Sequence, residues 1–569
     1  MATAKLQQRV GKQDYNKAAV VIIGAGFSGI CTAIDLIRHN KCHNFIILEK
    51  SSYIGGTWGD NRYPGCRCDV PSILYSYSFE PNPDWSRHYC EQEEIYDYLL
   101  GVAQKWGLFK YIRFNTAVEK AGWNAQTQQW EVDVQVTGGK DAEFADRYTI
   151  STDFLVSAVG QLSVPNYPPI AGLDTFQGKT MHSARWDWNF SLQGKRVAVI
   201  GNGATAIQII PEVAKCCSSV TVFQRTPSWI LPRLDGAIPG WKRKVYRYVP
   251  FVMKYLRSAF MHLRDAYFYD AIVTQDSRGN RALREECVEF LKKEIPNNAE
   301  LRAKLTPDYP PGCKRILVSD DLYAAYNEPN VFLETSPIER VTRTGVVAGG
   351  QEHSVDLIVL ATGFRAVEFL APMHIRGLKG RPLDDIWASG PRAYLGMMVE
   401  DLPNFAMLYG PNTNLGHNSI ILMLEAESHY ITNLISQVCA ARAHGQSLVI
   451  TPSRAAMDRF NNEVQRVLST STYGHPDCTS WYKNEAGLIT NNWSGTALDY
   501  RQRTSRITWS DFDLQGSAAE RVKAMQTTVI GTVADESNIG TWRLGHIVSA
   551  ATALAVIGAI AFRGSAIRI

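Results

Sequence analysis

Two glycine-rich turns, each set between a strand-like and a helix-like segment, constrain this chain more than any other feature. Residues 18–23 are apolar and mostly β-branched, and they run through the first turn into the helix-periodic residues 30–37. Residues 196–200 lead in the same way into the apolar residues 207–210. The turn residues are Gly24, Gly26 and Gly29 in the first copy and Gly201, Gly203 and Ala206 in the second. Because such a turn brings a pyrophosphate to free N–H groups at a helix start, the sequence predicts two dinucleotide-binding units.

The two units differ in the residue that follows their second strand. In the first unit, strand 45–48 is followed by Glu49, whose carboxylate can accept hydrogen bonds from an unmodified ribose and would repel a 2′-phosphate. This predicts FAD or NAD. In the second unit, strand 220–223 is followed by Gln224, Arg225 and Thr226. Because a guanidinium can bind a phosphate through two parallel hydrogen bonds, NADP(H) is predicted there, bound through Arg225 and Thr226.

An apolar strand pattern that ends in glycine recurs after each turn, at residues 153–160 and 356–363. With 569 residues the chain is too long for one ordinary core. We predict an α/β fold with two dinucleotide-binding (Rossmann-like) domains and a helical insertion. The predicted bounds are 1–165 and 366–510 for the FAD domain, 166–235 and 313–365 for the NADP domain, 236–312 for the helical insertion, and 511–569 for a C-terminal extension.

The linker between the two units carries a spaced motif. Its residues are Phe176, Gly178, His182, Trp186 and Asp187, in a stretch that looks loop-like. This motif resembles the fingerprint of the Baeyer–Villiger monooxygenases, flavoenzymes that insert one atom of O2 beside a ketone carbonyl. The resemblance covers about residues 15–500 and implies FAD in the first unit and NADPH in the second. His182 and Trp186 either couple motion of the linker to cofactor binding or simply pack it.

The long irregular segment 51–69 is of the kind that usually serves a function. It resembles the loop of this family that embraces the flavin, although Gly59 and Asp60 stand where the family often has an aromatic pair. The resemblance implies that the FAD neighbours are Thr57, Trp58, Asp69 and Tyr75, and that Arg67, Cys68 and Asp69 lie near the nicotinamide cofactor.

The dipeptide Lys314–Arg315 follows a Pro-Pro-Gly-Cys turn. In the family that it resembles, the lysine reaches the 2′-phosphate and the arginine swings beside the flavin, where Asp69 would hold the guanidinium. A fixed positive charge in a water-poor pocket stabilises the negative charge that develops during oxygen transfer. Arg315 and Asp69 are therefore the predicted catalytic residues.

Two further segments raise the question of a membrane. Residues 544–562 carry no formal charge between Arg543 and Arg563 and are just long enough to cross a bilayer core of about 30 Å. We predict a C-terminal membrane anchor that leaves the catalytic domains on the cytosolic face, with a helix docked on the protein as the alternative. The basic and aromatic residues of 241–269 have helical spacing, which predicts a helical subdomain on the NADP unit or, alternatively, a membrane-facing surface.

The cysteines and the net charge indicate the redox state of the thiols and the classes of partner that are excluded. Eleven scattered cysteines without a signal peptide predict reduced thiols in the cytosol. Cys66 and Cys68 lack the spacing of the redox pair of flavin disulfide reductases, so free thiols are expected. The formal net charge is only +4, and no basic block accompanies aromatic platforms. We predict no nucleic-acid partner and no metal site.

The predicted function is an NADPH-dependent, FAD-containing monooxygenase that converts a hydrophobic ketone, such as a polyketide or terpenoid intermediate, into an ester or lactone. One alternative is oxygenation of nitrogen or sulfur by the same flavin chemistry. A second is a membrane-tethered NADP-binding protein without oxygenase activity. The identity of the substrate and the oligomeric state do not follow from the sequence.

Overall fold

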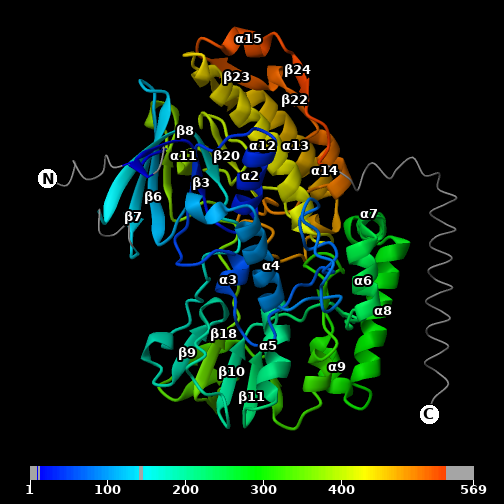
Figure 1. Cartoon of the computed structure of the whole chain (residues 1–569). Coiled ribbons are helices and arrows are strands. Elements are labelled where there is room, and N and C mark those ends of the chain that lie inside the picture. Colours follow the sequence, from blue (N-terminus) through cyan, green and yellow to red (C-terminus); the bar gives the residue numbers. More distant parts are fainter. Residues whose placement is uncertain (1–8, 11–12, 140–144, 534–569) are drawn as a thin grey trace.

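The computed structural model describes residues 9–10, 13–139 and 145–533. Two sheet-centred domains are stacked, with a group of helices along one side (Figure 1). The predicted anchor 544–562 lies outside the described residues. Within the part of the chain that is described, no helix is long and apolar enough to cross a membrane.

The upper domain in Figure 1 is built on an eight-stranded sheet in the order β19-β6-β7-β8-β3-β4-β5, with β20 beside β8. Five strands, β3, β4, β5, β19 and β20, run parallel to a neighbour, whereas the β6–β7 and β7–β8 pairs are antiparallel. The continuous apolar runs of β3 and β4 are buried on both faces, as parallel strands between helices must be. The strands are β3 (Lys17–Ile23), β4 (Phe45–Leu48), β5 (Ile112–Arg113), β6 (Thr116–Asn124), β7 (Gln129–Val136), β8 (Arg147–Ser157), β19 (His374–Arg376) and β20 (Phe405–Met407).

Both ends of the described chain contribute to this upper domain. Strand β20 pairs with β8 about 250 residues before it, and helix α12 packs on α2. The apolar face of α2 is buried between the sheet and α12. The helices are α2 (Phe27–Arg38), α3 (Thr57–Asp60), α4 (Gln92–Lys105), α11 (Leu383–Ile386), α12 (Ile420–Ala443), α13 (Arg454–Ser469), α14 (Ala497–Arg503) and α15 (Ala519–Lys523). Two small antiparallel pairs complete it, β21 (Val449–Pro452) with β23 (Phe512–Gln515) and β22 (Arg506–Thr508) with β24 (Thr527–Val529).

The lower domain has a five-stranded parallel sheet in the order β14-β11-β10-β18-β9. Helix α5 (Ala204–Ala214) follows β10, and α10 (Leu322–Ala325) packs on it. A small antiparallel sheet, β15 (Ile338–Val341), β16 (Gly345–Ala348) and β17 (Gln351–Ser354), covers one side through a separate apolar cluster. The main strands are β9 (Lys179–His182), β10 (Arg196–Ile200), β11 (Ser219–Phe223), β14 (Val331–Glu334) and β18 (Leu357–Leu360).

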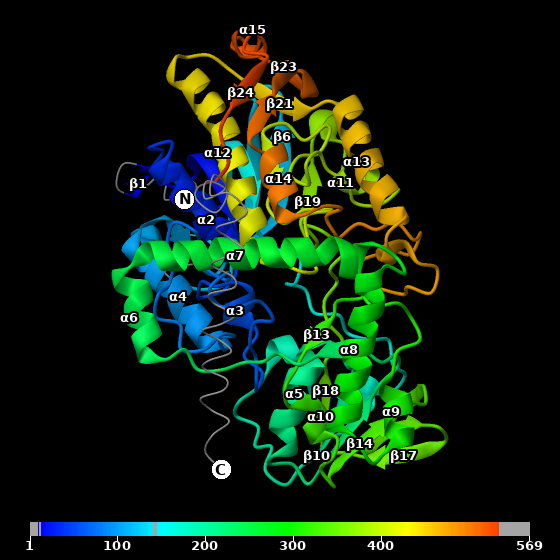
Figure 2. The ribbon, with the colours of Figure 1, turned by 90° about the vertical axis from the view of Figure 1, so that its right-hand side faces the viewer.

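The helical insertion lies between β12 (Ile230–Leu231) and β13 (Leu317–Val318), which pair with each other. Its helices are α6 (Gly240–Tyr248), α7 (Pro250–Phe268), α8 (Arg278–Glu294) and α9 (Ala299–Leu305), with a short π-helical turn, η5 (Tyr269–Val273), after α7. Figure 2 shows α7 running across the middle of the view, on the side of the molecule where the insertion lies in Figure 1. The outward face of α6 and α7 is unusually apolar, because Trp241 and Phe251 are 65% and 70% exposed.

Candidate functional site

The two glycine turns share one geometry. Gly24 has a φ of +106° and Gly201 a φ of +114°. A Cβ atom on Gly24 would lie 2.7 Å from the carbonyl oxygen of Ala158, and one on Gly201 would lie 2.5 Å from that of Ala361. These alanines stand at equivalent places, just past β8 and β18. Only glycine combines this backbone conformation with so close an approach.

Each glycine turn leads directly into a helix whose N-terminus has no side-chain cap. Gly26 and Gly203 are the N-cap residues of α2 and α5, and neither helix has a side-chain cap. Gly29 packs tightly in the first turn, since a Cβ there would lie 1.9 Å from the Gly24 carbonyl oxygen. Its counterpart Ala206 is fully buried. The first N–H groups of the two helices can therefore receive pyrophosphate groups.

Glu49 lies at the carboxyl end of β4, beside the first turn. Its carboxylate accepts hydrogen bonds of 2.8 Å from the backbone N–H groups of Ala25 and Ser51. Burial raises the pKa of Glu49, and these two N–H groups oppose that rise. The carboxylate is thus held at the rim of the strand, where a ribose would lie.

The segment after Glu49 places its aromatic residues against one another. The indole N–H of Trp58, on α3, donates to the Tyr75 hydroxyl at 3.0 Å, and the two rings meet edge to face. Thr57 begins α3 directly after Gly56. A Cβ on Gly26 would lie 3.6 Å from the Cα of Gly56, so this segment passes close to the first glycine turn.

The second unit brings two cations, Arg225 and Lys314, close together, with Asp308 also near Lys314. Arg225 and Thr226 follow β11, and Asn202 of the glycine turn donates to the Thr226 carbonyl oxygen at 2.7 Å. Burial lowers the pKa of Lys314, and the nearby Arg225 lowers it further. Among the described residues, neither Arg225 nor Lys314 forms an ion pair. Such a cluster fits a 2′-phosphate, whose charge would compensate both cations.

Arg315 meets Asp69 where the two sheet domains face each other. Its Nε lies 3.6 Å from the carboxylate of Asp69, and the side chain is 29% exposed. Burial alone would lower the pKa of Arg315, but the Asp69 carboxylate holds that pKa above its usual value. The phenols of Tyr409 and Tyr482 also lie near the guanidinium. The arginine is therefore permanently charged in a largely protein-lined setting.

Gln208 of α5 connects the NADP unit to the segment that carries Asp69. Its amide donates to the Arg67 carbonyl oxygen at 3.1 Å and to Asp69 at 3.3 Å, and its oxygen accepts from the Tyr63 hydroxyl at 3.0 Å. Sequence reasoning missed Gln208. The available signal was a single amide inside the apolar helix that follows the second glycine turn.

Arg67 and Cys68 are engaged within the protein. The Arg67 guanidinium lies 3.3 Å from Glu91 and 3.8 Å from Asp235. Cys66 and Cys68 are buried free thiols. Burial raises the pKa of Cys66 to about 12, which keeps this thiol protonated. A redox-active pair needs an accessible thiol that ionises readily, so the burial of both thiols and the raised pKa of Cys66 argue against one.

The linker motif contains a strand where we expected a loop. Residues 179–182 form β9, which joins the edge of the parallel sheet beside β18 because its backbone continues the ladder. Gly178 has no room for a side chain between the Phe176 ring and the Asp356 carbonyl oxygen, both within 2.6 Å of a Cβ. Asp187 pairs with Lys179 at 2.7 Å, and Trp186 lies against Trp188.

His182 closes this linker onto the end of the second sheet. The Ala184 N–H donates to its Nδ1 at 3.1 Å, so Nε2 carries the proton and donates to the Gly363 carbonyl oxygen at 3.0 Å. Burial lowers the pKa of His182, which favours this neutral form. These contacts attach the linker to the backbone at Gly363.

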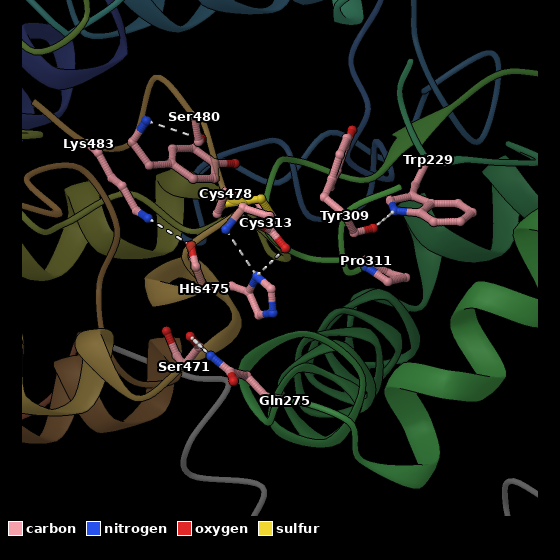
Figure 3. Close-up of a disulfide and its surroundings, with 12 residues drawn as sticks. Trp229, Gln275, Tyr309, Pro311, Cys313, Ser471, His475, Cys478, Ser480 and Lys483 are labelled. Carbon is pink, nitrogen blue, oxygen red and sulfur yellow. Dashed lines mark hydrogen bonds and ion pairs between the residues drawn. A yellow bond between two sulfur atoms is a disulfide. The ribbon is translucent and has the colours of Figure 1, made fainter. Parts of the chain in front are cut away.

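The prediction that all cysteines are reduced is wrong for one pair. Cys313 and Cys478 form a disulfide, although 165 residues separate them in sequence (Figure 3). Long-range folding brings the turn before Lys314 against the loop at 475–483, and sequence spacing gave no sign of it. In Figure 3 His475 and Lys483 lie beside the bridge, and Lys483 donates to the His475 carbonyl oxygen at 3.2 Å. The other nine cysteines are free.

Comparison with known proteins identifies relatives along nearly the whole chain. The family model described as flavin-binding monooxygenase-like matches residues 17–374. The FAD-binding monooxygenase ktnD of Aspergillus niger is 50% identical over 93% of this chain and 87% of its own. A Baeyer–Villiger monooxygenase of Streptomyces coelicolor is 38% identical over 90% of this chain and 96% of its own.

Solved structures agree with these relatives. A crystal structure of OTEMO in complex with FAD and NADP is 28% identical, with a TM-score of 0.76 over 88% of this chain and 99% of that chain. Closed cyclohexanone monooxygenase is 26% identical, with a TM-score of 0.75 over 91% and 100%. The predicted fold class and the predicted cofactors, FAD and NADPH, are thereby confirmed. The chain belongs to the flavin-binding monooxygenase-like family and, within it, to the Baeyer–Villiger monooxygenases.

Proposed function

We propose that this protein uses FAD and NADPH to insert one oxygen atom of O2 beside the carbonyl of a hydrophobic ketone, which gives an ester or a lactone. The observation that carries the proposal is the pairing of Arg315 with Asp69 at 3.6 Å, between a flavin-type and an NADP-type binding unit. When bound, the flavin reduced by NADPH supplies the activated oxygen.

The residues of the chain would divide the work around these cofactors. Glu49 would accept hydrogen bonds from the ribose of FAD, whereas Arg225 and Lys314 would bind the 2′-phosphate of NADPH. Arg315 would stabilise negative charge on the transferred oxygen and, when that oxygen adds to the carbonyl carbon, on the ketone oxygen. Asp69 would fix the position of the guanidinium, and Gln208 would fix Asp69 in turn.

The charge of Arg315 favours ketone oxidation over attack on nitrogen or sulfur. A ketone carbonyl needs a nucleophilic, deprotonated oxygen, whereas an amine or a sulfide needs an electrophilic, protonated one. A permanent cation close to the transferred oxygen favours the deprotonated form. The pairing of Arg315 with Asp69 supports a role of this kind for Arg315.

Isotope-labelled oxygen tests the reaction. The purified protein with bound FAD is supplied with NADPH, labelled O2, and a panel of ketones, amines and sulfides. We expect an ester or lactone that carries one labelled atom, formed in step with consumption of NADPH and O2. A labelled N-oxide or sulfoxide without any ester would favour the alternative oxygenase. Absence of bound flavin and of oxygen consumption would favour an NADP-binding protein without oxygenase activity.

The Arg315→Ala variant tests the proposed role of that arginine. Loss of a preorganised charge that stabilises the transition state costs about 10²- to 10³-fold in kcat. We therefore expect ester formation to fall by that factor while NADPH still reduces the flavin at the normal rate. Arg365→Ala is the matched control, because Arg365 is an exposed arginine paired with Glu368. Unchanged ester formation in Arg315→Ala would remove the catalytic assignment.

Aromatic residues around Arg315 support a hydrophobic substrate, such as a polyketide or terpenoid ketone. Four phenols lie near the guanidinium, those of Tyr75, Tyr409, Tyr473 and Tyr482. Burial raises the pKa of each phenol, so all four stay neutral at physiological pH. A ketone with a large apolar body would match such surroundings.

Membrane attachment is the second part of the proposal, and the outer face of α6 and α7 supports it. Trp241, Tyr248, Phe251 and Leu263 are all strongly exposed there. Helix α6 also carries four basic residues and no acidic one. An aromatic and basic helix face of this kind binds anionic lipid surfaces.

Vesicle sedimentation tests this attachment. We expect the full chain to sediment with vesicles that contain phosphatidylserine and to do so less with neutral vesicles. The double variant Trp241→Ser, Phe251→Ser should bind more weakly if this face takes part. Binding that persists in the variant would leave residues 544–562 as the attachment, and a full chain that stays in the supernatant with both vesicle types would end this part of the proposal.

A further inference from the structure

Helix α7 presents one face to the segments that build the proposed active site. Its buried residues recur at helical spacing on that face. Arg257 donates to the Ile73 carbonyl oxygen at 2.7 Å and to the Ser76 hydroxyl at 3.2 Å, a few residues beyond Asp69. Arg264 follows seven residues later, or two helical turns, and so lies on the same face.

A rigid set of contacts fixes the helix around Arg264. The carboxylate of Asp265 lies 2.9 Å from His417 Nε2 and 2.8 Å from the amide nitrogen of Asn418. The rings of Phe268 and His417 stack with centroids 3.6 Å apart. Arg264 itself donates from Nε to the His417 carbonyl oxygen at 2.7 Å. The base of the guanidinium is therefore held on the segment that follows β20.

The outer edge of the Arg264 guanidinium has no anionic partner. Among residues 9–10, 13–139 and 145–533, only Nε of its N–H groups donates a hydrogen bond, and Arg264 forms no ion pair. The side chain is half-buried. By contrast, the fully buried Arg501 lies 3.4 Å from Glu425. Because burial already costs this partly buried cation some of its hydration, an anion from outside the chain would find a favourable partner in the two Nη groups.

The surroundings of Arg264 coincide with those of the proposed catalytic pair. Burial lowers the pKa of Arg264, and the groups near it include Tyr89, Arg315, Cys68 and Asp69. The Asp69 carboxylate near Arg264 is already paired with Arg315. The carboxylate of Asp265, the next residue along α7, is held by His417 and Asn418. The 2′-phosphate would be compensated by Arg225 and Lys314, at the other end of the dinucleotide.

We propose that Arg264 binds a carboxylate of the substrate, so that the ketone oxidised by this protein is a keto acid with an apolar body. The inference rests on the proposed function and deepens it. The two free Nη groups of Arg264 would bind the carboxylate through two parallel hydrogen bonds, while the ketone carbonyl lies at Arg315. The separation of the two arginines then selects the distance between the two groups of the substrate.

The test compares acids with their neutral esters. Methyl-ketone fatty acids with four to ten carbons between the two functional groups are assayed beside their methyl esters, in the wild type and in Arg264→Gln. A charge-assisted contact contributes a factor of about 10 to 100. We expect the wild type to prefer the acid by that factor in kcat/KM at one chain length, and Arg264→Gln to lose the preference while its KM for NADPH stays unchanged.

Two controls keep the outcome specific. Arg278→Gln removes an exposed arginine of α8 and should keep the preference for the acid. Titration calorimetry of acid and ester on the oxidised holoenzyme measures binding without turnover, so it reports on Arg264 even if ketone oxidation itself fails. Equal binding of acid and ester to the wild type would overturn the proposal. If Arg264→Gln raised only the KM for NADPH, Arg264 would be a cofactor-binding residue. That result would also overturn the proposal.

Discussion

The Cys313–Cys478 disulfide should stabilise the junction of the two sheet domains. The bridge closes a loop of 165 residues, and in the chain-entropy model a loop of that length lowers the entropy of the unfolded state by the equivalent of about 5 kcal/mol. Measured effects of disulfides are usually smaller, about 2–4 kcal/mol. For a domain of 150–250 residues, this corresponds to a fall in Tm on the order of 5–10 °C when the bridge is absent.

Thermal melting of the holoenzyme measures this effect. The wild type is compared with and without dithiothreitol, and with the double variant Cys313→Ser, Cys478→Ser, whose Tm should not respond to the reductant. Thiol titration of the unfolded proteins fixes the redox state, because the oxidised chain should give nine thiols and the reduced chain eleven. If the unreduced wild type gave nine thiols and still melted at the temperature of the reduced protein, the loop-closure reasoning would be refuted.

Three further predictions concern single residues. Arg225→Gln should raise the KM for NADPH about 10- to 100-fold through loss of a charge-assisted contact, and leave the KM for NADH unchanged; equal effects on both cofactors would place Arg225 away from the 2′-phosphate. Burial raises the pKa of Glu427 from 4.5 to about 8. Between these two pH values the native state therefore keeps a proton that the unfolded state has released. As the pH rises through this range, the free energy of unfolding should fall by up to about 1.4 kcal/mol per pH unit. Glu427→Gln should lack this loss in urea unfolding, and parallel pH profiles of the variant and the wild type would contradict it. Gln208→Leu should leave Asp69 one donor short and raise the hydrogen peroxide released per NADPH, as measured by a peroxidase assay; unchanged coupling would limit Gln208 to packing.

Local patterns predicted the fold class because the elements concerned are local. A strand, a glycine turn and a helix occupy about 20 consecutive residues, and a Cβ on Gly24 or Gly201 would clash with a neighbouring carbonyl oxygen. The need for a residue without a Cβ atom appears in the sequence as a glycine at each of these positions. The acid or arginine at the end of the next strand is similarly close in sequence, which is why Glu49 and Arg225 could be named. Their roles at the cofactors stay predictions.

Contacts made by distant segments gave no comparable signal. Gln208 reaches Asp69 across 139 residues, and Cys478 reaches Cys313 across 165. Each depends on how the lower domain packs against the upper one, which no periodicity encodes. The linker strand β9 escaped prediction for the same reason, since only its pairing with β18, more than 170 residues later, makes it a strand. Glycine and charge within residues 176–187 favoured a loop.

Arg264 shows why the substrate could not be approached from the sequence. In the sequence it is one of many basic residues in an aromatic, helical insertion, and most such residues are solvated. Its position becomes informative only when α7 lies as in Figure 2 and Asp265 and Phe268 lock the helix onto His417 and Asn418. The same helix exposes Phe251 and Leu263 outward and turns Arg264 inward. If α7 both meets a lipid surface and binds the carboxylate of the ketone, an amphipathic keto acid is the substrate that fits both faces, and vesicle binding should then lower the KM for long-chain acids but not for short ones.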